Sequence, residues 1–407
     1  MNDCVKCGTC VPVCPVYRIT GRETFSARGR NQLLDVLPPE QRTRLFSEVF
    51  SKCLLCGACR EACPREVDTP GRIIAARAGL AAISGRSFVN FIARRALVSP
   101  GLFSSISLVS TVLGRILPAE SGLRLRLAGL DPAGLLQPAD PGYINGLDRA
   151  RTSRAGPAAA RVSYFAGCHA NYLQPEIGRA VDRLLGRCGQ SAPWTPAAQT
   201  CCGLAGLANG NLKEARQLAR KNIAAFEGGD QPILTSCASC YSHLASYPEL
   251  LADDDQWRNR AASFGARLQE FSTYFLDNLD PGPGNRAARP GTRCQVLYHD
   301  PCHLRFQQRI IDPPRRLLGL LPEVKLVELP EGPQCCGQGG LFQLAHPDLS
   351  LAIRERLLAK FSTLAAKSVL TTCSGCLLQW RQGLAARESP ARAEHLALFL
   401  DRLLPAA

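Results

Sequence analysis

Short apolar runs that each end at a cysteine recur in the second half of the chain. They are RVSYFAGC, PILTSC, QVLYHDPC and SVLTTC. Between them lie segments in which apolar residues recur every three or four positions, as in LKEARQLARKNIAAF and DLSLAIRERLLAKF. The short runs predict buried strands that present a cysteine at their carboxyl ends, and the longer segments predict amphipathic helices. Alternation of strand and helix indicates an α/β fold for this half.

The α/β pattern occurs twice. The overlay of the cysteines of residues 161–280 on those of residues 293–407 shows the repeat. Each unit holds an isolated cysteine, an adjacent pair followed by glycine, and a CxxC motif. The isolated cysteine precedes the pair by 33 residues in both units, and the pair precedes the CxxC motif by 35 residues in one and 37 in the other. The matching positions are Cys168, Cys201, Cys202, Cys237 and Cys240 in the first unit and Cys302, Cys335, Cys336, Cys373 and Cys376 in the second. We therefore expect two duplicated α/β domains.

The N-terminal part is patterned differently. Two cysteine runs are separated by helical stretches near NQLLDVL and EQRTRLFSEVFSK, and residues from about 71 to 117 are helical and apolar in pattern. A connection rich in Pro, Gly, Ala and Arg then extends to about residue 160. The predicted organisation is multidomain: a helical ferredoxin-like domain over residues 1–75, a helical segment and linker over 76–160, and two repeats over 161–280 and 293–407.

An uncharged run at residues 96–114 is long enough to raise the question of a membrane span. It contains Pro100 and several serines, and its apolar residues recur at helical spacing. This pattern favours an amphipathic helix that packs on the core, on a partner subunit or at a membrane surface.

Twenty cysteines in 407 residues are too few for a small disulfide scaffold and too many for an ordinary cytosolic enzyme. The first cysteine run begins at Cys4, which leaves no room for a secretory leader, so we expect a cytoplasmic protein whose reduced thiols bind metal. The net charge of +14 suits an acidic partner protein or the inner face of the cell membrane. No aromatic-and-basic motif of nucleic-acid readers is present, and nucleic acid is not an expected partner.

The two N-terminal runs have the form CxxCxxCxxxCP, which binds two [4Fe–4S] clusters in bacterial ferredoxins. The fourth cysteine of each run ligates the cluster of the other run. The predicted ligands are Cys4, Cys7, Cys10 and Cys63 for one cluster and Cys53, Cys56, Cys59 and Cys14 for the second. Zinc is disfavoured because it has no use for the third evenly spaced cysteine.

The adjacent cysteines of each repeat suggest a further metal site. Neighbouring side chains diverge, so Cys201 and Cys202 suit two different metal ions, or irons of one cluster, better than a single tetrahedral ion. Gly203 and Gly337 then permit backbone conformations that other residues resist. A structural zinc ion or free thiols would use only some of these ligands, and both alternatives stay open.

The order of the motifs resembles the iron–sulfur subunit of glycolate oxidase, and SARGR and YHDPCHL are further matches. It is also similar to lactate-utilisation iron–sulfur proteins, to an iron–sulfur subunit of anaerobic glycerol-3-phosphate dehydrogenase and to one of heterodisulfide reductase. The resemblance implies two cysteine-rich (CCG) domains, in which a complete set of five cysteines can bind one further noncubane [4Fe–4S] cluster.

The resemblance also implies a partner. This would be an FAD-containing 2-hydroxy-acid oxidase or dehydrogenase, since no GxGxxG motif follows a predicted strand here. The chain would pass electrons from that subunit to a quinone or another acceptor. The alternatives are a heterodisulfide reductase-like subunit that reduces a disulfide at the CCG sites, and a non-redox zinc-binding module. No catalytic residue is assigned.

Two histidines and two cysteines are not among the predicted metal ligands but deserve a separate interpretation. His169 and His303 each follow the isolated cysteine of a repeat, and a structural role at a strand end is favoured over hydrogen bonding to a cluster or proton delivery. Cys188 and Cys294 lie outside the repeat pattern and are predicted to be buried free thiols.

Overall fold

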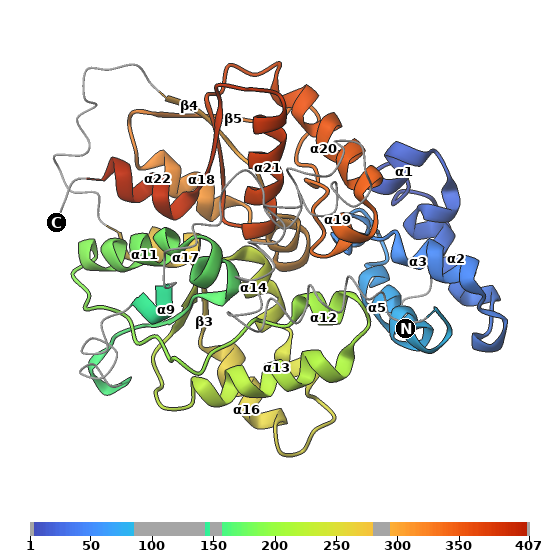
Figure 1. Ribbon diagram of the computed structural model, residues 1–407, viewed down its shortest axis with the longest axis horizontal. Coiled ribbons are helices and arrows are strands. Elements are labelled where there is room, and N and C mark those ends of the chain that lie inside the picture. The colour runs from blue at the N-terminus through green and yellow to red at the C-terminus, as the bar shows by residue number, and fades with distance from the viewer. Residues whose placement is uncertain (1–3, 85–142, 147–156, 280–293, 405–407) are drawn as a thin grey trace, which may run out of the picture.

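The computed structural model describes residues 4–84, 143–146, 157–279 and 294–404 (Figure 1). A helical N-terminal part lies at one end of the longest axis, and the α/β repeats make up the rest (Figure 1). The run at residues 96–114 and most of the predicted linker lie outside the described residues. Within the part of the chain that is described, none of the helices combines the length and the apolar character that a membrane crossing requires.

Helices and 3-10 turns are the regular secondary structure of the N-terminal part where it is described. Its helices are α1 (Pro15–Thr20), α2 (Ala27–Val36), α3 (Arg44–Ser51), α4 (Ala58–Glu61) and α5 (Thr69–Ser84), with 3-10 turns at Glu23–Phe25 and Pro39–Gln41. Pro15 begins α1 at a position where no backbone N–H is needed, and Ser26 caps α2 by accepting from the N–H of Gly29. Val49 and Phe50 lie one helical turn after Phe46, and all three are buried in α3. The prediction of a helical ferredoxin-like fold is confirmed.

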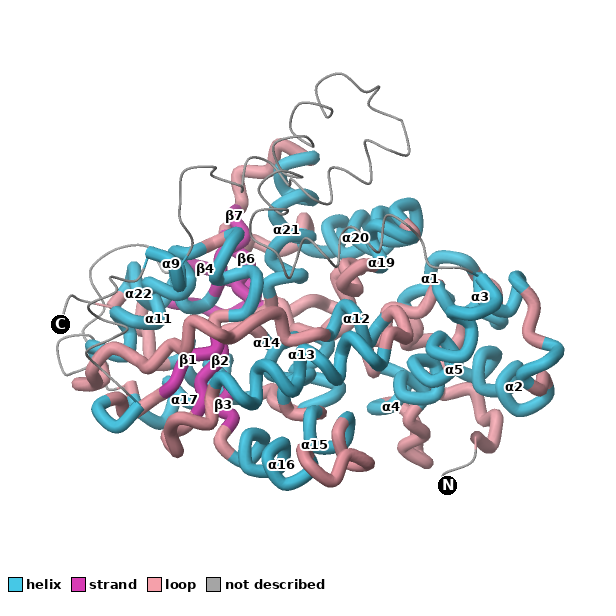
Figure 2. Tube along the Cα trace, turned by 60° about the horizontal axis from the view of Figure 1, so that its bottom comes forward, coloured by secondary structure: helices cyan, strands magenta, loops and turns pink. Residues whose placement is uncertain are grey.

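The first repeat is built on a parallel sheet of three strands in the order β1 (Ser163–Phe165), β2 (Ile233–Thr235), β3 (Leu268–Glu270) (Figure 2). Its helices are α11 (Pro175–Arg187), α12 (Leu204–Ala208), α13 (Leu212–Ala225), α14 (Ala238–Leu244), α15 (Tyr247–Leu250), α16 (Arg258–Ala266) and α17 (Phe271–Asn278), and the short elements α9 (Tyr143–Gly146) and Pro157–Ala159 precede the sheet. The predicted strands and the predicted helix over LKEARQLARKNIAAF are confirmed.

The second repeat has four parallel strands in the order β5 (Val324–Val327), β4 (Cys294–Tyr298), β6 (Ser368–Thr371), β7 (Arg392–His395). Its helices are α18 (Asp312–Gly319), α19 (Phe342–Ala345), α20 (Pro347–Phe361), α21 (Ser374–Ala386) and α22 (Leu396–Leu403). In the first repeat, a single parallel bridge between Ser163 and Trp194 stands where β5 pairs with β4. Both repeats therefore share one topology, as a duplication requires.

The two repeats share a hydrophobic core. Val181 and Leu184 of α11 belong to the same buried cluster as Phe399 and Leu400 of α22. Helix α11 of the first repeat packs on α22 of the second, and α17 of the first packs on α18 of the second. An early helix of each repeat therefore packs on the last helix of the other. Asp401 strengthens this contact because its carboxylate accepts from the guanidinium of Arg187 at 2.7 Å. This pairing buries a surface that one repeat alone would expose.

The N-terminal part packs on the second repeat. Phe50 is fully buried in one cluster with Phe342 and Ile353. Gln307 reaches back across this contact, and its side-chain amide donates to the carbonyl of Leu55 at 2.9 Å. The cysteine-bearing loop that contains Leu55 is thus held against the second repeat.

Candidate metal centres

The parallel strands bring the predicted cysteines to one edge of each sheet. Cys237 follows β2 and begins α14 as its N-cap, and Cys373 follows β6 and begins α21 in the same way. Cys168 and Cys302 likewise follow β1 and β4, each at the start of a π-helical turn (His169–Leu173 and His303–Gln307). The N-terminus of a helix carries partial positive charge, which favours the thiolate form that binds metal.

The loops that hold the adjacent cysteines are shaped by glycine. Gly203 has φ of +95° and Gly337 has φ of +88°, both in the left-handed region that other residues avoid. The expectation from the sequence is confirmed at both positions. A hydrogen bond from the Cys168 thiol, with further ones from Cys202 and the Gly203 N–H, lowers the pKa of Cys201 well below its usual value. The loop therefore favours a thiolate at this position.

The five cysteines of each repeat come together in the interior; we call them the first-repeat set and the second-repeat set. In the first-repeat set, thiol contacts join Cys168 to Cys201 and Cys202 to Cys240. In the second-repeat set, the sulfur atoms of Cys336 and Cys376 lie 3.3 Å apart. The adjacent cysteines and the CxxC cysteines of both repeats are buried, and only the isolated cysteines are partly exposed.

Four cysteines of the N-terminal part line one small cavity. They are Cys14, Cys53, Cys56 and Cys59, the ligands predicted for the second cluster, and we call them the inner set. Burial raises the pKa of Cys14, and the neighbouring thiols of Cys53 and Cys56 raise it further. The cavity joins Cys14 of the first run to three cysteines of the second, which is the exchange that the spacing predicts.

The outer set consists of Cys4, Cys7, Cys10 and Cys63. Burial raises the pKa of the Cys10 thiol, and the nearby thiols of Cys4 and Cys63 contribute. Cys7 is exposed, and the other three cysteines are partly exposed. The outer set is therefore the one nearest to solvent.

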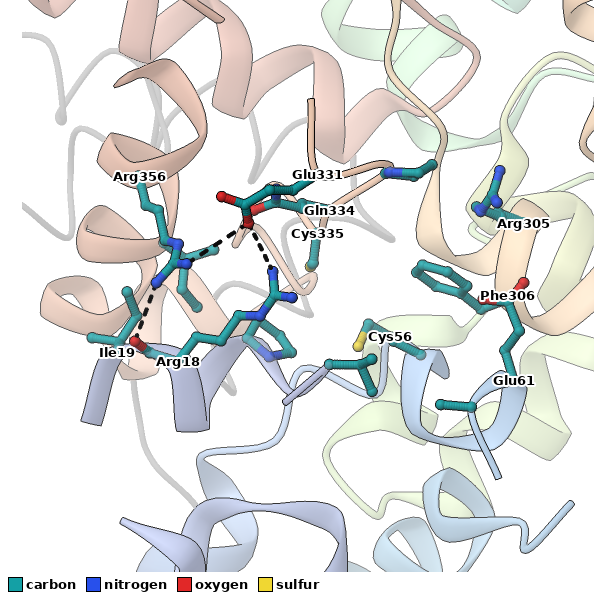
Figure 3. A pocket seen from close by; sticks show the side chains of 16 residues that line it. Arg18, Ile19, Cys56, Glu61, Arg305, Phe306, Glu331, Gln334, Cys335 and Arg356 are labelled. Carbon is teal, nitrogen blue, oxygen red and sulfur yellow. Dashed lines mark hydrogen bonds and ion pairs between the residues drawn. The ribbon is translucent and has the colours of Figure 1, made fainter. Parts of the chain in front are cut away.

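The four sets follow one another in a row. Cys10 of the outer set lies near enough to Cys59 of the inner set to help raise the pKa of Cys59, whose largest cause is burial. Cys56 of the inner set contacts the thiol of Cys335 in the second-repeat set, and this contact is the main reason why the pKa of Cys56 is raised. Figure 3 shows both side chains at a pocket of about 170 Å³, where Arg18 and Arg356 approach Glu331 from the rim. The second-repeat set therefore lies next to the ferredoxin part.

The two repeats meet at their CxxC motifs. The thiols of Cys237 and Cys373 contact each other. Ser239 places its hydroxyl 3.1 Å from the sulfur of Cys373, and the hydroxyl of Ser374 donates to the sulfur of Cys237 at 3.2 Å. The order of the sets is thus outer, inner, second-repeat, first-repeat.

This arrangement fits iron–sulfur clusters. All 20 cysteines lie within the described residues as free thiols, and 18 of them belong to the four sets. Buried thiols that crowd together without forming disulfides are typical of sites that hold several irons. The ligand assignment stays a prediction, and the close approach of the members of each set supports it.

The predicted free thiols depart from expectation. Cys188 and Cys294 are free and belong to no set, but both are half-buried instead of buried. Cys188 ends α11 and Cys294 begins β4, where the chain leaves the core. The prediction of full burial was wrong, because a residue at the end of an element keeps part of its surface in solvent.

The two histidines that the sequence analysis singled out have hydrogen-bond partners inside the protein. The Nε2 atom of His169 lies 3.2 Å from the side-chain amide of Gln174, and Nδ1 of His303 lies 3.0 Å from the hydroxyl of Ser239. Both contacts suit a structural role. Two other histidines, His243 and His299, have a buried Nε2 without a hydrogen-bond partner among the described residues and were not singled out from the sequence. The signal for His243 was its place three residues after Cys240, on one face of α14.

Burial lowers the pKa of every histidine to about 4, so all six are neutral in the folded protein at pH 7; they are His169, His243, His299, His303, His346 and His395. Below the ordinary histidine pKa of about 6.5, the unfolded chain binds protons that the folded chain does not. The histidines therefore cost the folded state no stability well above pH 6.5, and stability is lost as the pH falls from there toward 4.

The contribution of one histidine can be measured with His395→Asn. In the neutral ring, Nδ1 accepts from the N–H of Ala397 and Nε2 donates to the carbonyl of Ser236. Asparagine keeps an N-cap acceptor and does not titrate. Between pH 7.5 and pH 5.5, we expect wild type to lose roughly 1 kcal/mol more unfolding free energy than the variant, as measured by anaerobic urea denaturation. Parallel pH profiles would contradict this.

Comparison with known proteins agrees with these features. Residues 1–67 match a 4Fe-4S dicluster domain, and residues 162–245 and 296–381 each match a cysteine-rich domain known as CCG. A probable glycolate oxidase iron-sulfur subunit of Bacillus subtilis is 30% identical over the whole chain and 94% of its own length.

Two further relatives are similar over most of the chain. The glycolate oxidase iron-sulfur subunit of Escherichia coli is 26% identical over 92% of this chain and 88% of its own length. A subunit of the fumarate reductase (CoM/CoB) from Methanothermobacter marburgensis is 26% identical over 94% of this chain and 68% of its own length. The relatives thus share both the dicluster part and the repeats.

Proposed function

Because the chain belongs to the family of glycolate oxidase iron–sulfur subunits, we propose that it is the electron-transfer subunit of a complex that oxidises a 2-hydroxy acid. The observation that carries the proposal is the row of four cysteine sets: the inner, second-repeat and first-repeat sets are joined by thiol contacts, and Cys10 of the outer set lies near enough to Cys59 of the inner set to raise its pKa. When bound, iron–sulfur clusters accept and release single electrons. The protein would space the clusters and tune them by burial and by hydrogen bonds to sulfur.

The ligands follow from the sets. The outer and inner sets would each hold one [4Fe–4S] cluster, and the two repeat sets would each hold a noncubane [4Fe–4S] cluster. The free, buried thiols of the repeats support this, as do the hydroxyl groups of Ser239 and Ser374 beside Cys373 and Cys237. Hydrogen bonds to ligand sulfur stabilise the reduced state of such clusters.

The partner would be a separate FAD-containing 2-hydroxy-acid oxidase or dehydrogenase subunit. Its flavin would remove a hydride from the substrate, and electrons would then leave one at a time. Exposed Cys7 makes the outer end of the row the accessible one for a partner. The acceptor would be a quinone or another carrier. We place the complex in the cytoplasm, at the inner face of the membrane if the acceptor is a quinone.

The proposal is tested by anaerobic purification of the chain with its co-expressed flavoprotein. We expect iron and sulfide in equal amounts, and paramagnetic reduced clusters within one turnover after a 2-hydroxy acid is added. A flavoprotein variant without its FAD should leave the clusters oxidised under the same conditions. Zinc without sulfide, or clusters that stay oxidised in the intact complex, would contradict the proposal.

One observation favours a second function, reduction of a disulfide by a heterodisulfide reductase-like subunit. Both repeats keep all five cysteines, and Cys237 and Cys373 contact each other, so the two repeat sets adjoin. Two adjacent one-electron sites suit cleavage of one disulfide bond. Turnover of a low-molecular-weight disulfide by the dithionite-reduced protein would support this function, and oxidation of a 2-hydroxy acid by the complex without such turnover would exclude it.

A further inference from the structure

Each repeat directs one imidazole toward its cysteines, and the two come from different places in the fold. His243 lies on α14, three residues after Cys240, and is 3% exposed. His299 follows β4, three residues before Cys302, and is 2% exposed. In both rings Nε2 is buried and has no hydrogen-bond partner among the described residues. A buried nitrogen without a partner costs free energy unless a ligand satisfies it.

The contacts of Nδ1 determine the tautomer of His243. The hydroxyl of Ser246 donates its single hydrogen to the carbonyl of His243 at 2.7 Å. The same oxygen lies 3.1 Å from Nδ1 of His243, so Nδ1 must be the donor in that contact. Nε2 consequently carries a free lone pair. Histidines that bind metal are usually held in this way, with the second ring nitrogen donating to a fixed acceptor.

The free nitrogen of His243 points toward the adjacent cysteines. Nε2 lies 3.5 Å from the place that a Cβ atom would occupy at Gly203, directly after Cys201 and Cys202. In the second repeat, the residue three positions after Cys376 is Gln379, and its amide donates to Ser350. The second repeat therefore has no imidazole that could bind metal at this position.

His299 supplies the corresponding group from the opposite side. A ring nitrogen of His299 and the sulfur atoms of Cys336 and Cys376 all lie within 4.8 Å of one another, and all three residues are buried. The ring is fixed edge-on against Trp380, with centroids 5.5 Å apart. The residue three positions before Cys168 in the first repeat is Phe165, which is fully buried and offers no donor.

We propose that each repeat set is completed by one histidine nitrogen, His243 in the first repeat and His299 in the second, so that each site offers five thiolates and one imidazole to its metal. This inference rests on the proposed iron–sulfur function and goes beyond it. The ligand class is an iron–sulfur cluster with one iron bound by nitrogen. The ligands of each iron help to set the reduction potential of a cluster, so the potentials of the two repeat sites would differ from those of cysteine-only sites.

The test exchanges the residues between the repeats. His243→Gln places in the first repeat the residue that the second has at that position, and His299→Phe does the reverse. Both variants and wild type would be purified anaerobically as the full chain, with 15N-labelled histidine, and studied by pulsed electron paramagnetic resonance after stepwise reduction. Matched controls are His169→Gln and His303→Gln, because each of these histidines directly follows the isolated cysteine of its repeat but has an internal partner.

In wild type we expect histidine nitrogen couplings as large as those of imidazole bound directly to an iron–sulfur cluster. Each of the two test variants should lose one coupling and shift one reduction midpoint, while both controls keep all couplings and both midpoints. Two couplings that both survive in His243→Gln or in His299→Phe, or the absence of couplings from wild type beside normal cluster signals, would overturn the inference and leave the proposed function standing. Absence of any reducible cluster would overturn both.

Discussion

Replacing Cys56 with alanine is expected to remove about four irons per chain from the anaerobically purified protein. Cys56 lines the cavity of the inner set and also contacts Cys335 of the second-repeat set. Without this thiolate, one iron of the predicted inner cluster has no protein ligand. Since bound metal contributes to folding, we also expect the N-terminal part to unfold at lower temperature. Iron and sulfide analysis and circular dichroism give both readouts.

Cys188→Ala is the matched control, because Cys188 is a free thiol that belongs to no set. It should retain full iron content. Cys53→Ala provides a second comparison: it should lose the same irons, yet leave the contact with Cys335 in place. The spectrum of the second-repeat site should then change in Cys56→Ala only. Full iron content in Cys56→Ala would show that the inner set is assigned wrongly.

Replacing Arg77 with leucine is expected to lower the free energy of unfolding by about 3 kcal/mol. The Arg77 guanidinium donates to the carbonyls of Phe50, Ser51 and Cys53 at the end of α3, and to the carbonyl of Ala208 in the first repeat. Burial lowers its pKa to about 10, so it stays charged at pH 7. Leucine would leave these carbonyl groups without a donor.

The leucine variant should also expose the inner set to solvent. The Arg77 guanidinium holds the backbone that leads into Cys53, through its hydrogen bonds to the carbonyls of Ser51 and Cys53. Faster loss of iron to a chelator would report this change. Leucine at the exposed Arg65 controls for the loss of one positive charge and should leave both stability and iron release unchanged. Equal unfolding free energies for Arg77→Leu and wild type would contradict the role assigned to the guanidinium.

Much of the fold could be predicted from the sequence because short-range rules decide it. A strand that ends at a cysteine needs only a run of buried apolar residues, and β2 and β6 lie where PILTSC and SVLTTC place them. The amphipathic spacing of α13 and α20 is also local. The helical N-terminal part followed from the helical pattern around NQLLDVL, although α3 begins only at Arg44, after a 3-10 turn at Pro39–Gln41.

The order of the sets could not be predicted, because it depends on contacts between residues far apart in the chain. Gln307 binds the carbonyl of Leu55 across 252 positions, and this contact helps to hold Cys56 beside Cys335. Spacing within a motif carries no information about such docking. The same holds for His299, whose distance from Cys336 and Cys376 depends on how β4 lies in the sheet.

The packing of α11 on α22 and of α17 on α18 bears on how two repeats came to lie in one chain. The same two pairs of helices are matched on either side, as in an isologous contact between identical subunits. A protein with one repeat would expose that apolar surface, and a twofold homodimer would cover it. With both repeats in one chain the same association is intramolecular, so the two halves can differ, as Phe165 and His299 do at equivalent positions.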